Sequence, residues 1–480
     1  MKVTLVNPPY TFWKAGAEPL AALLGHHVPL GPLSLAAYVR ERLSGLTLEV
    51  LDAPAQSLSR EETVRRVIEG APDVVGITVT TTVAPAAEAI ALAVKAALPH
   101  TTVVVGGPHV SGTGLAALPP SKAFDLAVVG EGEETFRELL EALRDGRAFD
   151  QVQGILYRDA DGQVRQTPAR PPIADLDSLP LPAFDLLADF PRAYQPNIFF
   201  SPGGPAASLV TSRGCPFQCT FCDQSTFGHR YRAASAQSVF EAVRTLQRDY
   251  GIRYLVFYDD TFTLDRERVL ELCDLLRGLR PRMAWSCDAH VTTVDPALLR
   301  AMRRAGCWSI SYGLESGSPA VLKSLRKTFD LERAREAVRA TRAAGIRVRG
   351  LFIFGTPEES ASTAQETRAF IRSLPLTMMN LSKFTPYPGS ELHGQVRQGL
   401  AADSERLNGM NFVVPSRHLS IEDLEREYDQ TIRCFYSRPH AFIVHLPILL
   451  RRWQNIRRLA AAAPALLEAR RQKRRAGTGE

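Results

Sequence analysis

Three cysteines, Cys215, Cys219 and Cys222, follow the spacing C-x3-C-x2-C in a chain of 480 residues that holds only 7 cysteines. Thiolates are soft ligands that bind zinc or iron–sulfur clusters. The next cysteine along the chain is the distant Cys273. Structural zinc normally has four protein ligands, the fourth here being His229 or another residue, whereas a [4Fe–4S] cluster held by three cysteines leaves one iron open. The spacing favours the cluster over zinc.

Six strand-like segments follow residue 205, separated by helical stretches such as 235–249 and 331–344. Repeated strand–helix units predict a partial (β/α)6 barrel, whose chemistry would lie at the carboxyl-terminal rim of the strands. The three cysteines directly follow the first of these strands. The predicted strands are Ala207–Ser212, Tyr254–Tyr258, Met283–Cys287, Trp308–Gly313, Arg347–Phe354 and Met379–Phe384.

The first 140 or so residues also alternate between β-rich and helical patterns, which predicts an open, doubly wound, parallel α/β sheet. Ligands of such sheets bind beyond the carboxyl ends of the strands. Those ends carry prolines, glycines and polar residues that are candidates for ligand contact. The predicted strands are Val3–Asn7, Thr47–Asp52, Asp73–Thr80, Thr102–Gly107 and Leu126–Gly130.

A hairpin around Asp159–Gly162 and a proline-rich stretch over 168–182 separate the two α/β regions. We therefore predict four parts of the chain. They are an open α/β domain at 1–148, a hairpin and linker at 149–204, a barrel at 205–400, and a mainly helical carboxyl-terminal region with a basic tail at 401–480.

The net charge of +6 is concentrated in the tail, because residues 431–480 contain 11 Lys and Arg against Glu468 and Glu480. The rest of the chain has no basic excess, so nucleic-acid binding is not expected. The amino terminus lacks the pattern of a signal peptide, and no run reaches about 18 apolar residues, which predicts a cytoplasmic protein with reduced cysteines. The tail fits either a packed helical region with a solvated end or a peripheral contact with an anionic membrane.

The cysteine segment resembles the radical S-adenosylmethionine (SAM) superfamily, whose signature is C-x3-C-x-aromatic-C, with Phe221 as the aromatic residue. The likeness extends over about 205–395. It implies that Cys215, Cys219 and Cys222 hold a [4Fe–4S] cluster whose open iron binds SAM. Ordinary strand-end capping is the alternative role for the acidic residues. The residues that the resemblance places near SAM are Phe221, Asp259, Asp260, Gly313, Glu315, Ser316, Ile353 and Gly355.

An open α/β domain before such a barrel resembles the cobalamin-binding Rossmann-like domain, and Thr385–Ser390 resembles a turn of the cobalamin-binding branch of the superfamily. The loop after the first strand lacks the D-x-H-x-x-G motif that supplies histidine to cobalt in many cobalamin proteins. We therefore expect cobalamin with no protein histidine on its lower face; a domain that only packs against the barrel is the alternative. The residues implied for cobalamin are Asn7, Pro8, Thr78, Thr80, Gly106, Gly107, His109, Gly130 and Glu131.

The resemblance implies a cobalamin-dependent radical SAM enzyme, expected to methylate an unactivated carbon, or phosphorus, of a secondary or lipid-like metabolite. In the family's mechanism a 5′-deoxyadenosyl radical activates the substrate and methylcobalamin supplies the methyl group. Two alternatives stay open: an oxidative cyclase like the anaerobic magnesium-protoporphyrin ester cyclases, and a non-catalytic cobalamin or iron–sulfur sensor. The expected partners are a small-molecule substrate and an external electron donor such as flavodoxin or ferredoxin.

Overall fold

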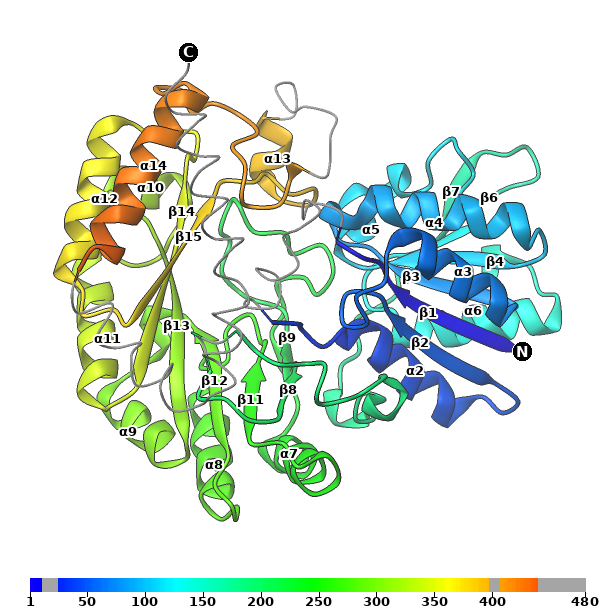
Figure 1. Ribbon diagram of the computed structural model, residues 1–480, viewed down its shortest axis with the longest axis horizontal. Helices are drawn as coiled ribbons and strands as arrows, with labels where there is room; N and C mark the ends of the chain where they lie inside the picture. The colour runs from blue at the N-terminus through cyan, green and yellow to red at the C-terminus, as the bar shows by residue number, and fades with distance from the viewer. Residues whose placement is uncertain (11–24, 198, 200, 397–405, 439–480) are drawn as a thin grey trace.

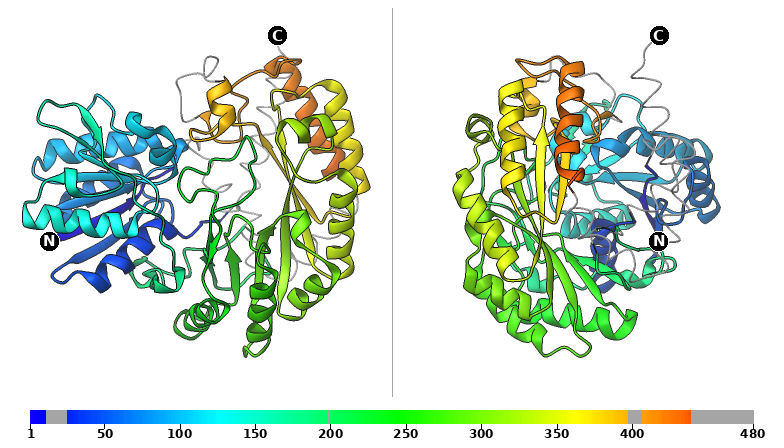
Figure 2. Two further views of the ribbon diagram at one scale, coloured as in Figure 1. Left: turned by 180° about the vertical axis from the view of Figure 1, so that it is seen from behind. Right: turned by 60° about the vertical axis from the view of Figure 1, so that its left-hand side comes forward.

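A computed structural model describes residues 1–10, 25–197, 199, 201–396 and 406–438 of the chain. Two α/β parts lie side by side (Figures 1 and 2). The carboxyl ends of the parallel strands in the amino-terminal part point toward the barrel (Figure 1). The fold therefore directs the ligand-binding edge of the first sheet at the second part of the chain.

The amino-terminal sheet has seven strands in the order β2-β1-β3-β4-β5-β6-β7. Its first five strands are parallel, as predicted, and their order matches the flavodoxin-like arrangement, in which ligands bind where the order reverses between β1 and β3. The predicted hairpin is confirmed, and it also extends this sheet antiparallel to β5. The strands are β1 (Lys2–Asn7), β2 (Thr47–Asp52), β3 (Val74–Thr78), β4 (Thr102–Gly106), β5 (Leu126–Val128), β6 (Ile155–Arg158) and β7 (Val164–Gln166).

Helices cover both faces of this sheet and form two apolar cores. Helix α2 (Leu30–Arg42) and helix α6 (Glu133–Asp145) pack on one face. Helix α3 (Arg60–Gly70) and helix α4 (Ala84–Ala97) pack on the other. The short helix α5 (Pro108–Thr113) begins directly after β4, at the edge that faces the barrel.

The second part is a six-stranded, fully parallel sheet in the order β15-β14-β13-β12-β11-β8. Helices cover its outer surface, which confirms a partial (β/α)6 barrel (Figure 1). Along β14, every second residue is partly exposed and the others are buried, as expected for a strand that packs helices on one side and faces the lumen on the other. The strands are β8 (Ala206–Leu209), β11 (Tyr254–Phe257), β12 (Ala284–Ala289), β13 (Cys307–Glu315), β14 (Arg347–Phe354) and β15 (Met378–Lys383).

Local signals in the sequence set the helix boundaries of the barrel. Side chains of Ser235, Asp265 and Asp330 accept hydrogen bonds from the first turns of α7, α8 and α11, respectively, and so cap them. The barrel helices are α7 (Ala236–Tyr250), α8 (Arg266–Arg277), α9 (Pro296–Arg304), α10 (Pro319–Ser324), α11 (Leu331–Ala343) and α12 (Ala361–Ser373). Short 3₁₀ turns lie at Thr81–Val83, Gly114–Ala117, Phe149–Gln151, Leu176–Ser178, Phe184–Leu186 and Val291–Thr293.

The strand predicted at Ala207–Ser212 is divided in two. Strand β8 ends at Leu209, and a short antiparallel pair follows, β9 (Ser212–Arg213) with β10 (Arg232–Ala233). This pair brackets the segment that contains Cys215, Cys219 and Cys222. It lies on the side of the barrel that faces the amino-terminal part (Figure 1).

The carboxyl-terminal region contributes α13 (Glu391–Val396) and α14 (Ile421–Tyr436), and α14 packs against α12. The apolar and basic tail predicted from residue 439 onward lies outside the described residues. Within the part of the chain that the structure describes, no helix is both long and apolar enough to cross a membrane.

Candidate active site at the junction of the two parts

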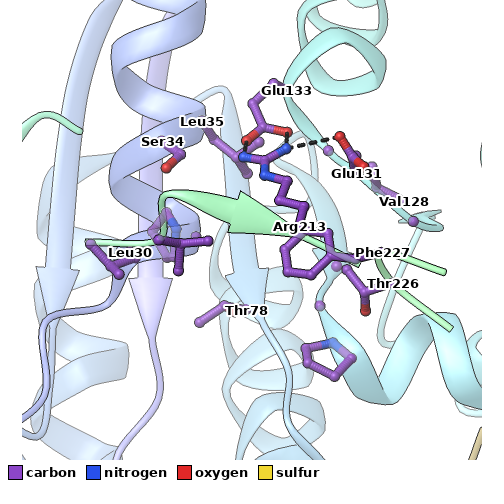
Figure 3. A pocket seen from close by; sticks show the side chains of 18 of the residues that line it. Leu30, Ser34, Leu35, Thr78, Val128, Glu131, Glu133, Arg213, Thr226 and Phe227 are labelled. Carbon is purple, nitrogen blue, oxygen red and sulfur yellow. Dashed lines mark hydrogen bonds and ion pairs between the residues drawn. The ribbon is translucent and has the colours of Figure 1, made fainter. Parts of the chain in front are cut away.

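A cavity of about 540 Å³ joins the edge of the amino-terminal sheet to the cysteine loop (Figure 3). Its walls on one side come from β1, β3, β4 and β5, and from α2 and α6. On the other side the walls include Cys215, Cys222, Asp223 and Asp260. Segments that are far apart in the sequence therefore share one space, at the sheet edge where ligands of this fold class bind.

Glycines open the amino-terminal side of the cavity. Gly107 has φ +111, and a Cβ there would lie 2.8 Å from the carbonyl oxygen of Val79. A Cβ at Gly76 would lie 2.6 Å from the Cδ2 atom of Leu5. Both glycines thus allow close packing within the sheet edge, and they line the cavity beside an apolar slot between α2 and α6 that includes Leu35 and Phe136. Such a slot accepts a large ligand at close approach to the backbone.

The predicted cobalamin residues divide into two sets. Thr78, Gly106, Gly107, Gly130 and Glu131 line the cavity. The buried hydroxyl oxygens of Ser225 and Thr226, just beyond the cysteines, have no protein partner, and Thr226 also lines the cavity. The slot and such unpaired hydroxyls fit a bulky ligand that carries amide groups, which is the chemistry of cobalamin.

The other predicted cobalamin residues lie outside the cavity lining. Asn7 donates from Nδ2 to Asp52 at 2.8 Å, and Pro8 is buried. The hydroxyl oxygen of Thr80 lies 3.2 Å from that of Thr82. The Nδ1 atom of His109 lies 3.2 Å from the hydroxyl of Thr81, and burial lowers the pKa of this imidazole.

The cysteine loop is held in shape by its own backbone. The amide of Cys215 donates to the carbonyl of Gly228 at 3.2 Å, and the amide of Cys222 donates to the carbonyl of Cys219 at 3.1 Å. The amide group of Gln224 donates to the carbonyls of Cys215 and Phe217, both at 3.0 Å. The loop therefore presents its three thiols from a fixed scaffold.

Cys215 and Cys219 are partly exposed and Cys222 is exposed by surface area, yet each is surrounded by protein that desolvates it to a different degree. Burial raises the pKa of Cys219, and it raises the pKa of Cys222 to about 12. Such thiols keep their protons until a metal centre displaces them. His229 is exposed, and among the described side chains no three from His, Cys, Asp and Glu gather closely enough to hold a single metal ion.

Two adjacent aspartates at the end of β11 have different surroundings. Asp259 is buried, and its oxygens accept hydrogen bonds from the amide of Thr211 at 2.5 Å and from its hydroxyl at 2.6 Å. Desolvation by the surrounding protein raises the pKa of both aspartates, and the charge of Asp259 also raises the pKa of Asp260. Asp260 is exposed and lines the cavity, whereas Asp259 does not line it.

A buried lysine, Lys327, lies beside the cysteine loop, and the sequence analysis did not predict it as a site residue. The Nζ atom of Lys327 lies 3.0 Å from Glu315 and 5.5 Å from the centre of the Phe221 ring. Although burial lowers it, the neighbouring carboxylate of Glu315 raises the pKa of Lys327 overall. Glu315 has φ +58, a conformation that is uncommon outside glycine. The ammonium group of Lys327 is therefore close to both Phe221 and Glu315, two of the residues predicted to lie near SAM.

The remaining predicted SAM residues lie along β13 and β14. The hydroxyl oxygen of Ser316 lies 3.0 Å from that of Thr367, and Gly313 and Ile353 are partly exposed. Gly355 has φ +86, and its amide donates to Glu359 at 3.2 Å. Ser316 and Gly355 therefore contact neighbouring elements of the barrel, while Gly313 and Ile353 keep part of their surface exposed.

Polar side chains also occupy the strands of the barrel interior, which the sequence analysis did not single out. The hydroxyl of Tyr258 lies 2.6 Å from Nδ1 of His27. Arg349 donates to Ser311 at 2.9 Å and lies 3.4 Å from Asp288. The signal available in the sequence was the alternation of polar residues along β12 and β14. The barrel therefore offers hydrogen-bonding and charged groups where the amino-terminal cavity offers mostly apolar ones.

The architecture and the shared cavity define an enzyme class with two α/β cofactor domains. Residues 209–371 match the radical SAM superfamily, and residues 19–140 match the B12 binding domain. The chain is 31% identical over 447 residues to an uncharacterized methyltransferase of Pyrococcus horikoshii, covering 92% of this chain and 94% of that one. It therefore belongs to the cobalamin-binding branch of the radical SAM superfamily.

Other comparisons agree with this family. The chain is 29% identical to the anaerobic magnesium-protoporphyrin IX monomethyl ester cyclase of Rubrivivax gelatinosus, covering 86% of this chain and 73% of that one. Its fold is similar to that of the radical SAM methyltransferase TsrM of Kitasatospora setae with cobalamin and a [4Fe–4S] cluster bound, with a TM-score of 0.70, 18% identity, and coverage of 91% and 89%. The chain is a radical SAM enzyme whose cofactors are a [4Fe–4S] cluster, SAM and cobalamin.

Proposed function

We propose that this enzyme transfers a methyl group to an unactivated carbon, or to phosphorus, of a small-molecule substrate. One observation supports this most: a single cavity reaches both the glycine-lined edge of the amino-terminal sheet and the loop with Cys215 and Cys222. A methyl donor and a radical generator must share a substrate, so their sites must open into the same space.

The chain's own residues have separate tasks in this proposal. Cys215, Cys219 and Cys222 ligate the cluster, and Asp260 accepts hydrogen bonds from SAM. Gly76 and Gly107 leave room for the corrinoid, and apolar walls exclude water from the space around it. When bound, the cluster and SAM supply a carbon-centred radical, and cobalamin carries the methyl group. The division of the chain at residues 148, 204 and 400 belongs to the same proposal.

A lipid-like substrate, an external flavodoxin or ferredoxin, and contact of the tail with a membrane are further parts of the proposal. The basic composition of residues 431–480 supports the membrane contact. Reductive cleavage of SAM consumes one electron, which an external donor would deliver at the partly exposed cysteine loop.

The test begins with the anaerobically reconstituted enzyme, SAM labelled with deuterium in its methyl group, and a strong reductant. We expect 5′-deoxyadenosine, labelled methylcobalamin, and transfer of the label to a compound in a fractionated extract of lipids and polar metabolites. Absence of 5′-deoxyadenosine would indicate a sensor and contradict the enzymatic proposal.

A second candidate is radical oxidation or ring closure, which the 29% identity to the cyclase of Rubrivivax gelatinosus favours. The same experiment separates the two reactions. Methyl transfer adds a labelled methyl group to the substrate, whereas oxidation removes hydrogen or adds oxygen without label. A product of the second kind would replace methyl transfer as the assigned reaction.

A further inference from the structure

The cysteine loop is tied to the amino-terminal domain at its beginning. Arg213 in β9 lies two residues before Cys215, and its guanidinium reaches across to two carboxylates in the turn after β5. Its Nη1 atom lies 2.9 Å from Glu131, and its Nη2 atom lies 2.5 Å from Glu133 (Figure 3). The other oxygen of Glu131 lies 2.5 Å from Arg232 in β10, which follows the loop. Both strands that bracket the cysteines therefore bind the same turn.

This ionic cluster is buried and balanced in charge. The four side chains are between 4% and 9% exposed, and two arginines face two glutamates. Buried charges are stable only while they are paired. The loop cannot move away from the amino-terminal domain without leaving charges unpaired. The same turn, Gly130–Glu133, lines the cavity. The four charged side chains therefore connect the wall of the proposed corrinoid site directly to the base of the cysteine loop.

The end of the loop is held by a different kind of contact. Asp223 directly follows Cys222, and a Cβ at Gly389 would overlap its carboxylate. Gly389 also lies against Gly112 of α5, where a Cβ would lie 2.5 Å from the carbonyl oxygen of Pro388. The turn after β15 therefore lies against the backbone of α5 and against the carboxylate of Asp223, so it links the end of the cysteine loop to the amino-terminal domain.

We propose that these two contacts form a positioning clamp that fixes the separation between the corrinoid and the cluster. Arg213, Glu131 and Glu133 act as positioning residues at the start of the loop, and Gly112 and Gly389 act at its end. Neither contact needs to touch SAM or substrate. The inference rests on the proposed assignment of the cluster to Cys215, Cys219 and Cys222, and it adds that the amino-terminal domain sets where that cluster lies.

The experiment measures the distance directly in the holoenzyme. Cob(II)alamin and the reduced cluster are both paramagnetic, so their spin–spin interaction in frozen solution reports their separation. We compare Glu133→Gln with Glu427→Gln, because Glu427 forms a 2.6 Å pair with Arg368 between α12 and α14, away from both cofactor sites. Both substitutions remove one charge from a largely buried pair, so a general loss of stability affects both variants.

We expect the Glu133→Gln enzyme to show a shifted or broadened spin–spin interaction, and the Glu427→Gln enzyme to match the wild type. Arg213→Lys, which keeps the charge, should lie between the wild type and Arg213→Met. Gly112→Ala acts at the other contact and should broaden the interaction even if the Glu133 variant does not fold. Iron and corrinoid contents are measured in every sample.

The outcomes distinguish the two proposals. A wild-type enzyme that binds no corrinoid or no cluster contradicts the proposed function itself. A wild-type enzyme with both cofactors, and variants whose spin–spin interaction equals that of Glu427→Gln, overturns the clamp and leaves the proposed function standing.

Discussion

The two sides of the cavity are lined by different kinds of residue. The amino-terminal side has mostly glycines and apolar side chains, and its two carboxylates, Glu131 and Glu133, are paired with Arg213. The barrel side has the thiols of Cys215 and Cys222 and the carboxylates of Asp223 and Asp260. A bulky corrinoid needs space, whereas a charged sulfonium donor and a cluster need ligands. The difference indicates that volume selects the ligand on one side and charge selects it on the other.

The substitution with the largest expected effect removes one of the three proposed cluster-ligating cysteines from the barrel side. Cys219→Ala should abolish cluster assembly and the formation of 5′-deoxyadenosine, because a cubane with only two protein thiolates is not retained. Iron and sulfide analysis with product chromatography checks this. Cys434→Ala is the control, since that thiol in α14 donates to the carbonyl of Arg368 at 3.8 Å and its loss should leave the cluster intact. A Cys219→Ala enzyme that keeps full iron and product would contradict the ligand assignment.

The next test removes space from the amino-terminal side. Gly107→Ala should weaken corrinoid binding about 100-fold, because a side chain at φ +111 is strained by about 1–3 kcal/mol and would press on Val79. Absorption spectra of titrated enzyme measure the affinity. Gly114→Ala is the control, as its φ of +58 and ψ of −133 also disfavour alanine but nothing lies within 4 Å of the added Cβ. Equal corrinoid affinity in both variants would show that the slot is not the binding site.

A third test asks whether every polar group on the barrel side serves a ligand. Burial raises the pKa of the Glu359 carboxyl to about 7 from 4.5. Its stabilising protonated form is fully present below pH 4.5, and stability is lost as the pH rises through about 7, because the unfolded chain releases the proton first. Glu359→Gln should lack this decline, so its free energy of unfolding relative to wild type should rise by about 3 kcal/mol between acid and alkaline pH. Denaturant titrations at several pH values measure this. If the free energies of unfolding of wild type and Glu359→Gln change in the same way with pH, the proposed structural role of this carboxyl is contradicted.

The substitutions with the smallest expected effect distinguish the roles of the neighbouring residues Asp259 and Asp260. Asp260→Asn should weaken SAM binding about tenfold, the cost of one charge-assisted hydrogen bond. Asp259→Asn should instead lower the free energy of unfolding, because its carboxylate holds Thr211 in the structure. Equilibrium dialysis with labelled SAM and denaturant titration of both variants check the pair. Loss of SAM binding in Asp259→Asn alone would reverse the assignment.

Much of the fold was predictable because periodicity and glycines are local signals. The strands β1, β2 and β14 begin and end within a residue of the predicted bounds, and the hairpin was predicted from its turn residues. The pairing of that hairpin with β5 was not, because pairing with a distant strand leaves no local signal. The division of the strand at Ala207–Ser212 was missed for the same reason, since β9 exists only by pairing with β10.

The site was predictable where chemistry needs a rare residue at a fixed spacing, as for the three cysteines. The site was not predictable where it depends on ion pairs between residues that are far apart in the sequence. Glu131 was predicted as a cobalamin residue, yet its carboxylate also pairs with Arg213 and Arg232. Lys327 has no motif of its own, and only its position beside Glu315 reveals it. Such pairs depend on tertiary contact, which a single sequence does not encode locally.

The central claim is that three thiols hold a cluster whose remaining iron binds SAM within reach of the corrinoid cavity. The most direct measurement is electron–nuclear double resonance on the reduced enzyme with SAM carrying ¹⁵N in its amino group. The account predicts a hyperfine coupling from that nitrogen to the cluster, in protein that also contains corrinoid. A cluster signal that SAM leaves unchanged, or zinc in place of iron, would contradict it.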